Sequence, residues 1–173
     1  AVSDVSEVID YLVDGKGISA SLVPPTDPSK IYVSGFSYGG MVGLYAAALD
    51  TRISGIASFS GFTPMRTDND DKSTGGIRKY WQWHHILPKL GLYHDQESKI
   101  PYDYEDIIGL IAPRNCLIYS PVKDRFTDII DIKKCIASVQ NNWKDGLSFI
   151  TPDDICRFQR EQHEVLIDWL KKL

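Results

Sequence analysis

The sequence predicts an α/β fold in which a mostly parallel sheet is flanked by helices. Short apolar runs alternate along the chain with segments whose apolar residues recur every three or four positions. Such alternation indicates parallel strands joined by right-handed helical crossovers. A glycine-rich pentapeptide, residues 35–39, connects one of these strands directly to the helix that follows it. At 173 residues, the chain has about the length of one domain.

Each element has its own local signal. Ser3 and Asp4 can cap a first helix, which is expected to end near Gly15 and Gly17. A proline-containing loop then leads to the first of several short apolar runs that are typical of buried strands. The other helices are recognised by apolar residues that recur on one face. The expected strands cover residues 30–34, 53–59, 116–120 and 147–150, and the later helices lie at 41–49, 132–143 and 165–173.

The composition argues against several classes of partner. The formal net charge is -4 and the sequence pI is near 5.5, so nothing indicates a basic surface for nucleic acid or a polybasic membrane anchor. No apolar stretch reaches the roughly 18 to 20 residues that a membrane helix needs. The N-terminal residues also lack the pattern of a signal peptide. A small or neutral partner is therefore expected, with no indication of the compartment.

No cofactor or metal is expected. The segment from Gly35 to Gly40 lacks both the dinucleotide-binding order and the Gly-Lys-Ser/Thr ending of a P-loop. The adjacent His84 and His85 have no nearby acidic or thiol ligands, and the acidic run 68–72 lacks the full pattern of a calcium loop. The cysteines are odd in number and have no Cys-x-x-Cys spacing, so each is interpreted as a small apolar side chain: Cys116, Cys135 and Cys156.

The pentapeptide Gly35-Phe36-Ser37-Tyr38-Gly39 is the feature that indicates a chemistry. Gly-x-Ser-x-Gly between a strand and a helix is typical of a nucleophile elbow, where a strained turn exposes the serine hydroxyl. Small flanking residues let the backbone cross closely there. The alternative is an ordinary glycine-rich loop. The strand before it and the apolar-periodic helix after it favour the elbow, with Ser37 as nucleophile.

Several further segments carry a resemblance to a known family. They include Gly35 to Gly40, Thr74-Gly75-Gly76-Ile77-Arg78, His84 to Gly91, Ile100 to Tyr104 and Ile111-Ala112-Pro113-Arg114. Together they resemble the C-terminal half of an α/β-hydrolase in the dienelactone-hydrolase and prolyl-oligopeptidase-like branch. They are similar in particular to bacterial acetyl-xylan-esterase-like hydrolases. The resemblance implies one partial α/β-hydrolase domain over residues 1–173, with a lid-like insertion at 62–110, that hydrolyses carboxylic esters.

Hydrolases of this kind use a serine, an acid and a histidine in that chain order. Asp124 matches the acid, because it follows the strand expected at residues 116–120. The alternative for Asp124 is a solvated loop carboxylate. Asp128, just before the next helix, is interpreted as a helix N-cap.

The expected histidine is missing from its usual place in this pattern. The loop after the last strand, residues 151–158, contains no histidine, and a serine without a base is a weak nucleophile. His84, in the insertion, is the candidate base, and the alternative is an aromatic packing cluster with Tyr80, Trp81 and Trp83. His163 is interpreted as a structural or surface residue of the last helix.

The oxyanion hole is also incomplete in the sequence. The Tyr38 N–H is expected to be one donor, but the loop that supplies the second donor follows an earlier strand that this chain lacks. The sheet edge where such strands pair would be open. A complementary N-terminal half, or an oligomer formed through this edge, is therefore the partner hypothesis.

Three functions are compatible with these residues. The leading one is a serine hydrolase of small-molecule carboxylic esters. A catalytically impaired pseudo-hydrolase, serving as a binding module or as one half of a larger enzyme, is the alternative favoured by the 151–158 loop. Peptidase or acyl-transferase chemistry on the same nucleophile is the third.

Overall fold

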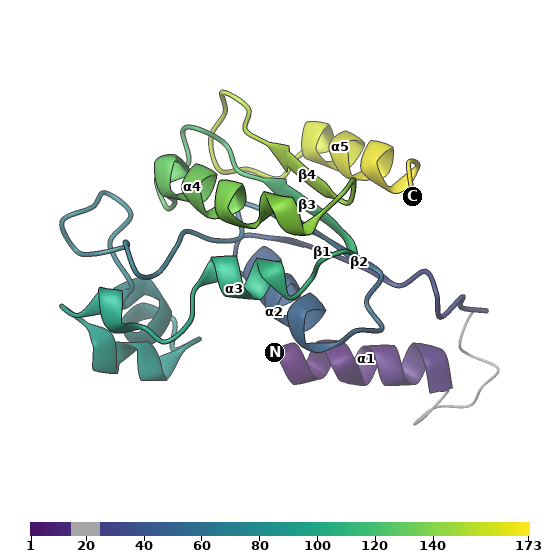
Figure 1. The fold of residues 1–173 in the computed structure, drawn as a ribbon, viewed down its shortest axis with the longest axis horizontal. Helices are drawn as coiled ribbons and strands as arrows, with labels where there is room; N and C mark the ends of the chain where they lie inside the picture. Colours follow the sequence, from purple (N-terminus) through teal and green to yellow (C-terminus); the bar gives the residue numbers. More distant parts are fainter. Residues whose placement is uncertain (15–24) are drawn as a thin grey trace.

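The fold is an α/β sandwich built on one parallel sheet (Figure 1). The computed structural model of the 173-residue chain describes residues 1–14 and 25–173. The end of the first helix near Gly15 and Gly17 lies outside the described residues. In chain order, the helices and strands are α1 (Val2–Asp14), β1 (Tyr32–Phe36), α2 (Tyr38–Leu49), β2 (Gly55–Phe59), α3 (Tyr104–Gly109), β3 (Asn115–Tyr119), α4 (Ile129–Val139), β4 (Leu147–Ile150) and α5 (Arg160–Leu170).

The sheet contains β1, β2, β3 and β4 in sequence order, and all its pairings are parallel. Phe36, Phe59 and Tyr119 are register partners at the last positions of β1, β2 and β3. The carboxyl ends of the strands therefore meet at one edge. In sheets of this kind, the loops at that edge carry the reactive groups.

Alternation of side chains along the strands gives the sheet two apolar faces. One face, with Ile56, Cys116 and Ile118, packs in the large core that α2 and α4 complete. The other face, with Ala57, Phe59 and Leu117, packs in a smaller core with Trp169 of α5. Both faces of the central strands are covered, which explains why β2 and β3 read as continuous apolar runs.

The α/β prediction is confirmed, with shifts at the element boundaries. The first strand was expected at 30–34 but spans Tyr32–Phe36, since its pairing with β2 continues up to the residue before Ser37. The second strand was expected from residue 53 but starts at Gly55. Helix α2 begins at Tyr38, directly after the serine, and not at Met41. Only β4 has the expected limits, Leu147–Ile150.

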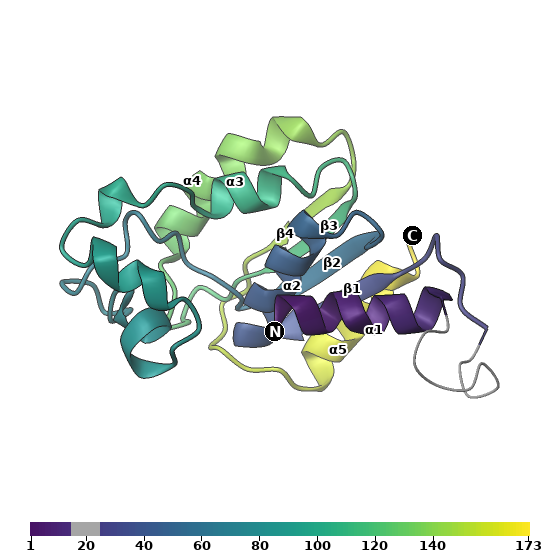
Figure 2. The same cartoon turned by 90° about the horizontal axis from the view of Figure 1, so that it is seen from below.

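The segment that the sequence predicts to be a lid-like insertion, residues 62–110, is called the insertion below, and it lies mostly to one side of the sheet in both ribbon views (Figures 1 and 2). Its backbone forms a π-helical turn at Lys79–Trp83 and 3₁₀ turns at Pro88–Tyr93 and Glu97–Lys99; a further 3₁₀ turn, Gln140–Asn142, follows α4. Its last part is α3, which packs against α2 and α4. Tyr104 and Ile108 of α3 are fully buried, so this end of the insertion belongs to the main core.

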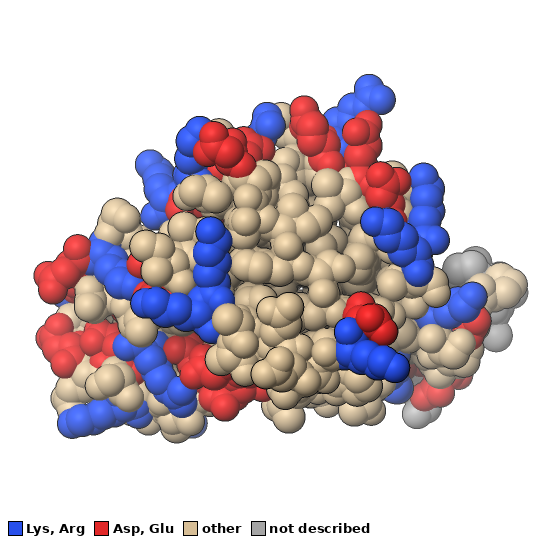
Figure 3. All heavy atoms as spheres, turned by 45° about the horizontal axis from the view of Figure 1, so that its top comes forward, with Lys and Arg blue, Asp and Glu red and all other residues tan. Residues whose placement is uncertain are grey.

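Surface charge is mixed on the face shown in Figure 3. Acidic and basic side chains lie next to one another around an uncharged central area. Among the described residues, no helix is long and apolar enough to cross a membrane.

Asp103 connects the two ends of the insertion. Its carboxylate accepts hydrogen bonds from the backbone N–H groups of Met65 (2.7 Å), Arg66 (2.7 Å) and Tyr104 (2.8 Å). The side chain is 1 % exposed and also forms the N-cap of α3. The start of the insertion is thereby attached to the start of α3.

We expect Asp103→Ala to lower the free energy of unfolding by about 3 kcal/mol, because it leaves buried N–H groups without an acceptor. Chemical denaturation would measure this loss. Asp153→Ala is the matched control, since its carboxylate is 77 % exposed and pairs with the exposed Lys123. The control should stay within about 0.5 kcal/mol of the wild type. Equal effects of the two substitutions would contradict the assigned role of Asp103.

Candidate active site

Ser37 lies in the turn between β1 and α2, with φ 53° and ψ -122°. A left-handed φ in a residue with a side chain costs on the order of 1–3 kcal/mol and is concentrated at functional sites. The turn is held by a hydrogen bond from the Ser37 N–H to the Phe59 carbonyl, 2.8 Å long. The Ser37 hydroxyl does not cap α2. The predicted strand–turn–helix geometry around this serine is therefore present.

The turn depends on close backbone contacts at glycines. A Cβ atom at Gly35 would lie 2.3 Å from the carbonyl carbon of Gly39, and one at Gly40 would lie 2.9 Å from the Gly35 carbonyl oxygen. At Gly61, after β2, a Cβ would lie 2.9 Å from the carbonyl carbon of Gly40. Gly39 is different, because a Cβ there meets nothing within 4 Å. The start of α2 therefore passes the ends of β1 and β2 at distances that only glycine allows.

The Tyr38 N–H is the first of α2. The first N–H groups of a helix have no intrahelical acceptor, and the helix dipole adds partial positive charge there. The Tyr38 ring is partly buried, and this burial raises the pKa of its hydroxyl. The backbone N–H at this position is suited to stabilise an anion that forms at Ser37.

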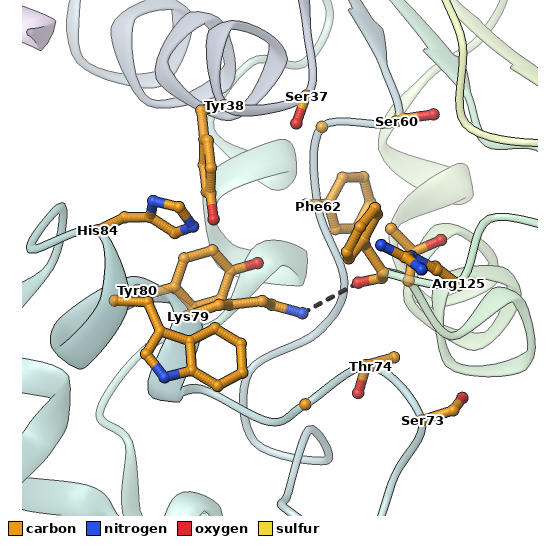
Figure 4. A pocket seen from close by; sticks show the side chains of 15 residues that line it. Ser37, Tyr38, Ser60, Phe62, Ser73, Thr74, Lys79, Tyr80, His84 and Arg125 are labelled. Atoms are coloured by element: carbon orange, nitrogen blue, oxygen red, sulfur yellow. Dashed lines mark hydrogen bonds between the residues drawn. The ribbon is translucent and has the colours of Figure 1, made fainter.

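A cavity of about 390 Å³ opens beside Ser37 and Tyr38 (Figure 4). The loop after β2 and the insertion form much of its wall, and the loop after β3 lies on the side opposite His84. The lining residues are Ser37, Tyr38, Ser60, Gly61, Phe62, Ser73, Thr74, Gly75, Lys79, Tyr80, Trp83, His84, Arg125, Phe126 and Thr127.

A buried lysine attaches the insertion to the loop after β3. The Lys79 ammonium pairs with Asp68 at 2.9 Å and donates a hydrogen bond to the Phe126 carbonyl at 3.0 Å, the dashed line in Figure 4. Both partners of the ion pair are buried, and Thr74 donates to the same carboxylate. Removing either charge would leave the other uncompensated. The hydrogen bond from Lys79 to the Phe126 carbonyl joins this segment to the loop after β3.

Asp124 lies in the loop after β3, as the sequence predicted, and is 5 % exposed. Its Oδ1 accepts a hydrogen bond from the Phe126 N–H at 2.9 Å. Its Oδ2 is buried and has no hydrogen-bond partner among the described residues. Asp128 is the N-cap of α4, accepting from the N–H groups of Ile130 and Asp131, which confirms its predicted role.

Among the described residues, no hydrogen bond or ion pair joins a histidine to Asp124. The exposed His84 ring lines the cavity with its centroid 4.8 Å from that of Tyr38, and the Tyr38 ring lies between His84 and Ser37 in Figure 4. In the described part of the chain, no hydrogen bond joins His84 to Ser37 or to Asp124. His163 is exposed on α5, with its ring centroid 4.5 Å from that of Phe158. The structure therefore brings Ser37, Tyr38 and His84 to one cavity and leaves Asp124 outside its wall.

Sequence reasoning missed several residues at the edge of the sheet where the strands end. Ser60, directly after β2, has φ 49° and is buried with no hydrogen-bond partner for its hydroxyl within the described part of the chain. Cys156 was grouped with the buried Cys116 and Cys135, but it is only partly buried, and burial followed by the charge of Asp124 raises the pKa of its thiol. For Ser60, the position directly after a strand was the available signal. Lys79 gave no signal, because its role depends on how the insertion folds.

No group of three or more metal-ligating side chains is found among residues 1–14 and 25–173. The chemistry that this arrangement supports is acyl transfer through the Ser37 hydroxyl, with the N-terminus of α2 beside the reacting oxygen.

Comparison with known protein sequences finds similarity to carbohydrate esterases. The family described as "Glucuronyl esterase, fungi" matches residues 4–145. Carbohydrate esterase MZ0003, from an unknown prokaryotic organism, is 31% identical over 106 residues, which are 59% of this chain and 24% of that protein.

Solved structures share the fold. A promiscuous CE15 esterase from a marine bacterial metagenome has a TM-score of 0.78 at 20% identity and matches 98% of this chain and 46% of its own. Acetyl xylan esterase 1 from Thermoanaerobacterium sp. JW/SL YS485 has a TM-score of 0.61 at 14% identity, over 99% of this chain and 51% of its own. The chain thus spans about half of these structures and a quarter of the curated relative.

We expect Gly35→Ala to lower the free energy of unfolding by about 2 kcal/mol, because its methyl group would overlap the Gly39 carbonyl. Gly39→Ala is the matched control, since the space there is open and alanine favours a helix by up to about 1 kcal/mol. Thermal and chemical unfolding of the two variants would measure this contrast. A Gly35→Ala variant as stable as Gly39→Ala would rule out the proposed backbone crossing.

Proposed function

The chain belongs to the glucuronyl esterase family, and on that premise we propose that its cavity binds and hydrolyses a carboxylic ester of a carbohydrate. The observation that carries the proposal is Ser37, held on a strained turn at a cavity of about 390 Å³ with the first N–H of α2 beside it. This is the arrangement of a nucleophile elbow.

In the proposed reaction, the Ser37 Oγ attacks the ester carbon. The carbonyl oxygen becomes an oxyanion that the Tyr38 N–H stabilises, and the alcohol leaves as the acyl-enzyme forms. Water then releases the acid and regenerates the serine. The described residues contain no strand before β1, so a second oxyanion donor of the usual kind must come from elsewhere.

The cavity wall favours a sugar as the acid part of the ester. Trp83 is 57% exposed at the cavity and offers a flat ring face, and Tyr80 and Phe62 add aromatic surface. Arg125 adds a cationic donor that suits hydroxyl and carbonyl oxygens. Because the family is that of glucuronyl esterases, we propose a uronic-acid ester in preference to an acetyl ester.

His84 is the histidine of the cavity wall and is the proposed base. To accept the Ser37 proton it must move away from the Tyr38 ring, which it contacts in this structure. It must also act without Asp124, which does not line the cavity. This separation favours the second candidate function, a binding module with little turnover.

We further propose that the outer edge of β1 pairs with a strand from another part of the complete fold. Among the described strands, β1 pairs only with β2, which leaves its other edge open. The similar solved structures are about twice as long as the matched region. An unpaired edge of a parallel sheet is a site for pairing or aggregation.

Ser37→Ala is expected to abolish both ester hydrolysis and labelling by a fluorophosphonate, because it removes the attacking oxygen. Hydrolysis of a methyl ester of glucuronic acid, together with intact mass after labelling, measures the two effects. Ser73→Ala is the control, since Ser73 lines the same cavity away from the turn.

Wild type should gain one adduct and Ser73→Ala should behave like it. Hydrolysis that persists in Ser37→Ala would refute the proposed nucleophile. If His84 is the base, His84→Ala should lose turnover at least about 100-fold, whereas His163→Ala should not.

The open-edge proposal predicts that the native protein has a mass well above 19.5 kDa. Light scattering after size exclusion would measure that mass. A monodisperse 19.5 kDa monomer would count against a partner on β1.

A further inference from the structure

The fixed charges at the cavity beside Ser37 are all positive. No aspartate or glutamate is among the described residues that line it, whereas Lys79 and Arg125 both do. The Lys79 ammonium is buried, and Asp68 compensates its charge at 2.9 Å. The cation of Arg125 is therefore the charge of the cavity wall that has no counter-ion.

Arg125 differs in this respect from the rest of the arginines. Its side chain is exposed, and it forms neither an ion pair nor a hydrogen bond with any residue that the structure describes. The other arginines are each held by carboxylates or by backbone carbonyl oxygens: Arg52, Arg66, Arg78, Arg114, Arg157 and Arg160. The N–H groups of Arg125 are thus free to donate to a ligand.

One contact orders the Arg125 side chain. Its guanidinium carbon lies over the Phe126 ring, 4.6 Å from the ring centroid. Figure 4 shows the guanidinium near Phe62, on the side of the cavity opposite His84. Contact with an aromatic ring uses none of the N–H donors. It also restricts a long side chain in advance, so less conformational entropy is lost when a ligand binds.

A hydroxyl donor lies in the same loop. The Thr127 side chain lines the cavity, and its Oγ1 is buried with no hydrogen-bond partner in residues 1–14 and 25–173. A buried polar atom without a partner calls for an explanation. A ligand oxygen at this wall would give Thr127 an acceptor and would give Arg125 a counter-ion if it carried negative charge.

The ester that Ser37 attacks does not supply this charge. An ester is neutral, and the oxyanion that forms from it is stabilised by the Tyr38 N–H at the start of α2. Arg125 belongs to a different element, the loop after β3. A guanidinium binds a carboxylate through two parallel N–H···O hydrogen bonds. The wall at Arg125 therefore suits a second, ionised group of the same substrate.

We propose that Arg125 binds a free carboxylate that the substrate carries in addition to the ester attacked by Ser37. The substrate class is then a partly esterified acidic saccharide, in which one uronic acid is esterified and another is free. This role of Arg125 rests on the proposed function of the cavity and specifies the charge of its substrate. Because the Arg125 side chain is exposed, salt should weaken the preference for the charged substrate.

Two forms of a glucuronic acid disaccharide test this role. The dimethyl ester is uncharged, whereas each of the two monomethyl esters keeps one carboxylate. The wild type should hydrolyse at least one monoester with a higher kcat/KM than the diester. In Arg125→Gln, the ratio of kcat/KM for this monoester over the diester should fall at least about 10-fold, because charge-assisted hydrogen bonds are lost.

Arg160→Gln is the matched control, since it removes the same charge from an exposed side chain that pairs with Glu164 on α5. Its ratio should equal that of the wild type. An unchanged ratio in Arg125→Gln would overturn the proposal. So would a result in which Arg125→Gln weakens inhibition by free glucuronate but leaves the ratio unchanged, because Arg125 would then bind the product carboxylate.

A binding measurement does not depend on turnover. Titration calorimetry gives the Kd of the monoester and of the diester for Ser37→Ala, with arginine or glutamine at position 125. Glutamine should raise the Kd of the monoester at least about 10-fold more than that of the diester, and about 0.5 M NaCl should reduce this difference. Equal changes for the two ligands would overturn the proposal. Failure of the proposed function has a different signature, namely ester hydrolysis that persists in Ser37→Ala.

Discussion

The whole site depends on one backbone constraint, the close crossing of the chain at the ends of β1 and β2. Gly35, Gly40 and Gly61 permit contacts that a Cβ atom would block, and Ser37 is held at a positive φ between them. The strain is sustained because β1 and β2 are paired up to Phe36 and Phe59, and α2 begins immediately afterwards. The backbone of a serine in this position is fixed on both sides, so its hydroxyl is held in one place and does not move with a flexible loop.

The remaining groups of the site are distributed over the other strand ends and the insertion. Ser60 follows β2, Asp124 follows β3 and Cys156 follows β4, so the sheet determines their order and spacing. The insertion contributes recognition surface instead. Its buried Lys79–Asp68 pair and the hydrogen bond to Phe126 bind this surface to the loop after β3. The position of the substrate wall therefore depends on a buried charge pair, whereas the position of the nucleophile depends on backbone packing.

This division explains which features the sequence could predict. The parallel sheet, the turn at Ser37 and the cap at Asp128 arise from local patterns, and the structure contains all of them. Strand limits moved by a few residues because pairing with neighbours decides them. The hydrogen bond from Lys79 to Phe126 and the ring contact of His84 with Tyr38 join residues far apart in sequence. They depend on the path of the insertion and of the loop after β3, for which no local signal exists.

Two parts of the site are incomplete, namely the oxyanion hole and the general base. They are independent of each other. A strand added to the open edge of β1 could bring a second oxyanion donor, an effect worth about 10²–10³ in rate. It would not place a base beside Ser37 through Asp124, because Asp124 follows β3, across β2 from that edge. A general base contributes about 10²–10⁴ in rate. A partner at the β1 edge therefore addresses charge stabilisation alone, and the activation of Ser37 depends separately on a group that can accept its proton.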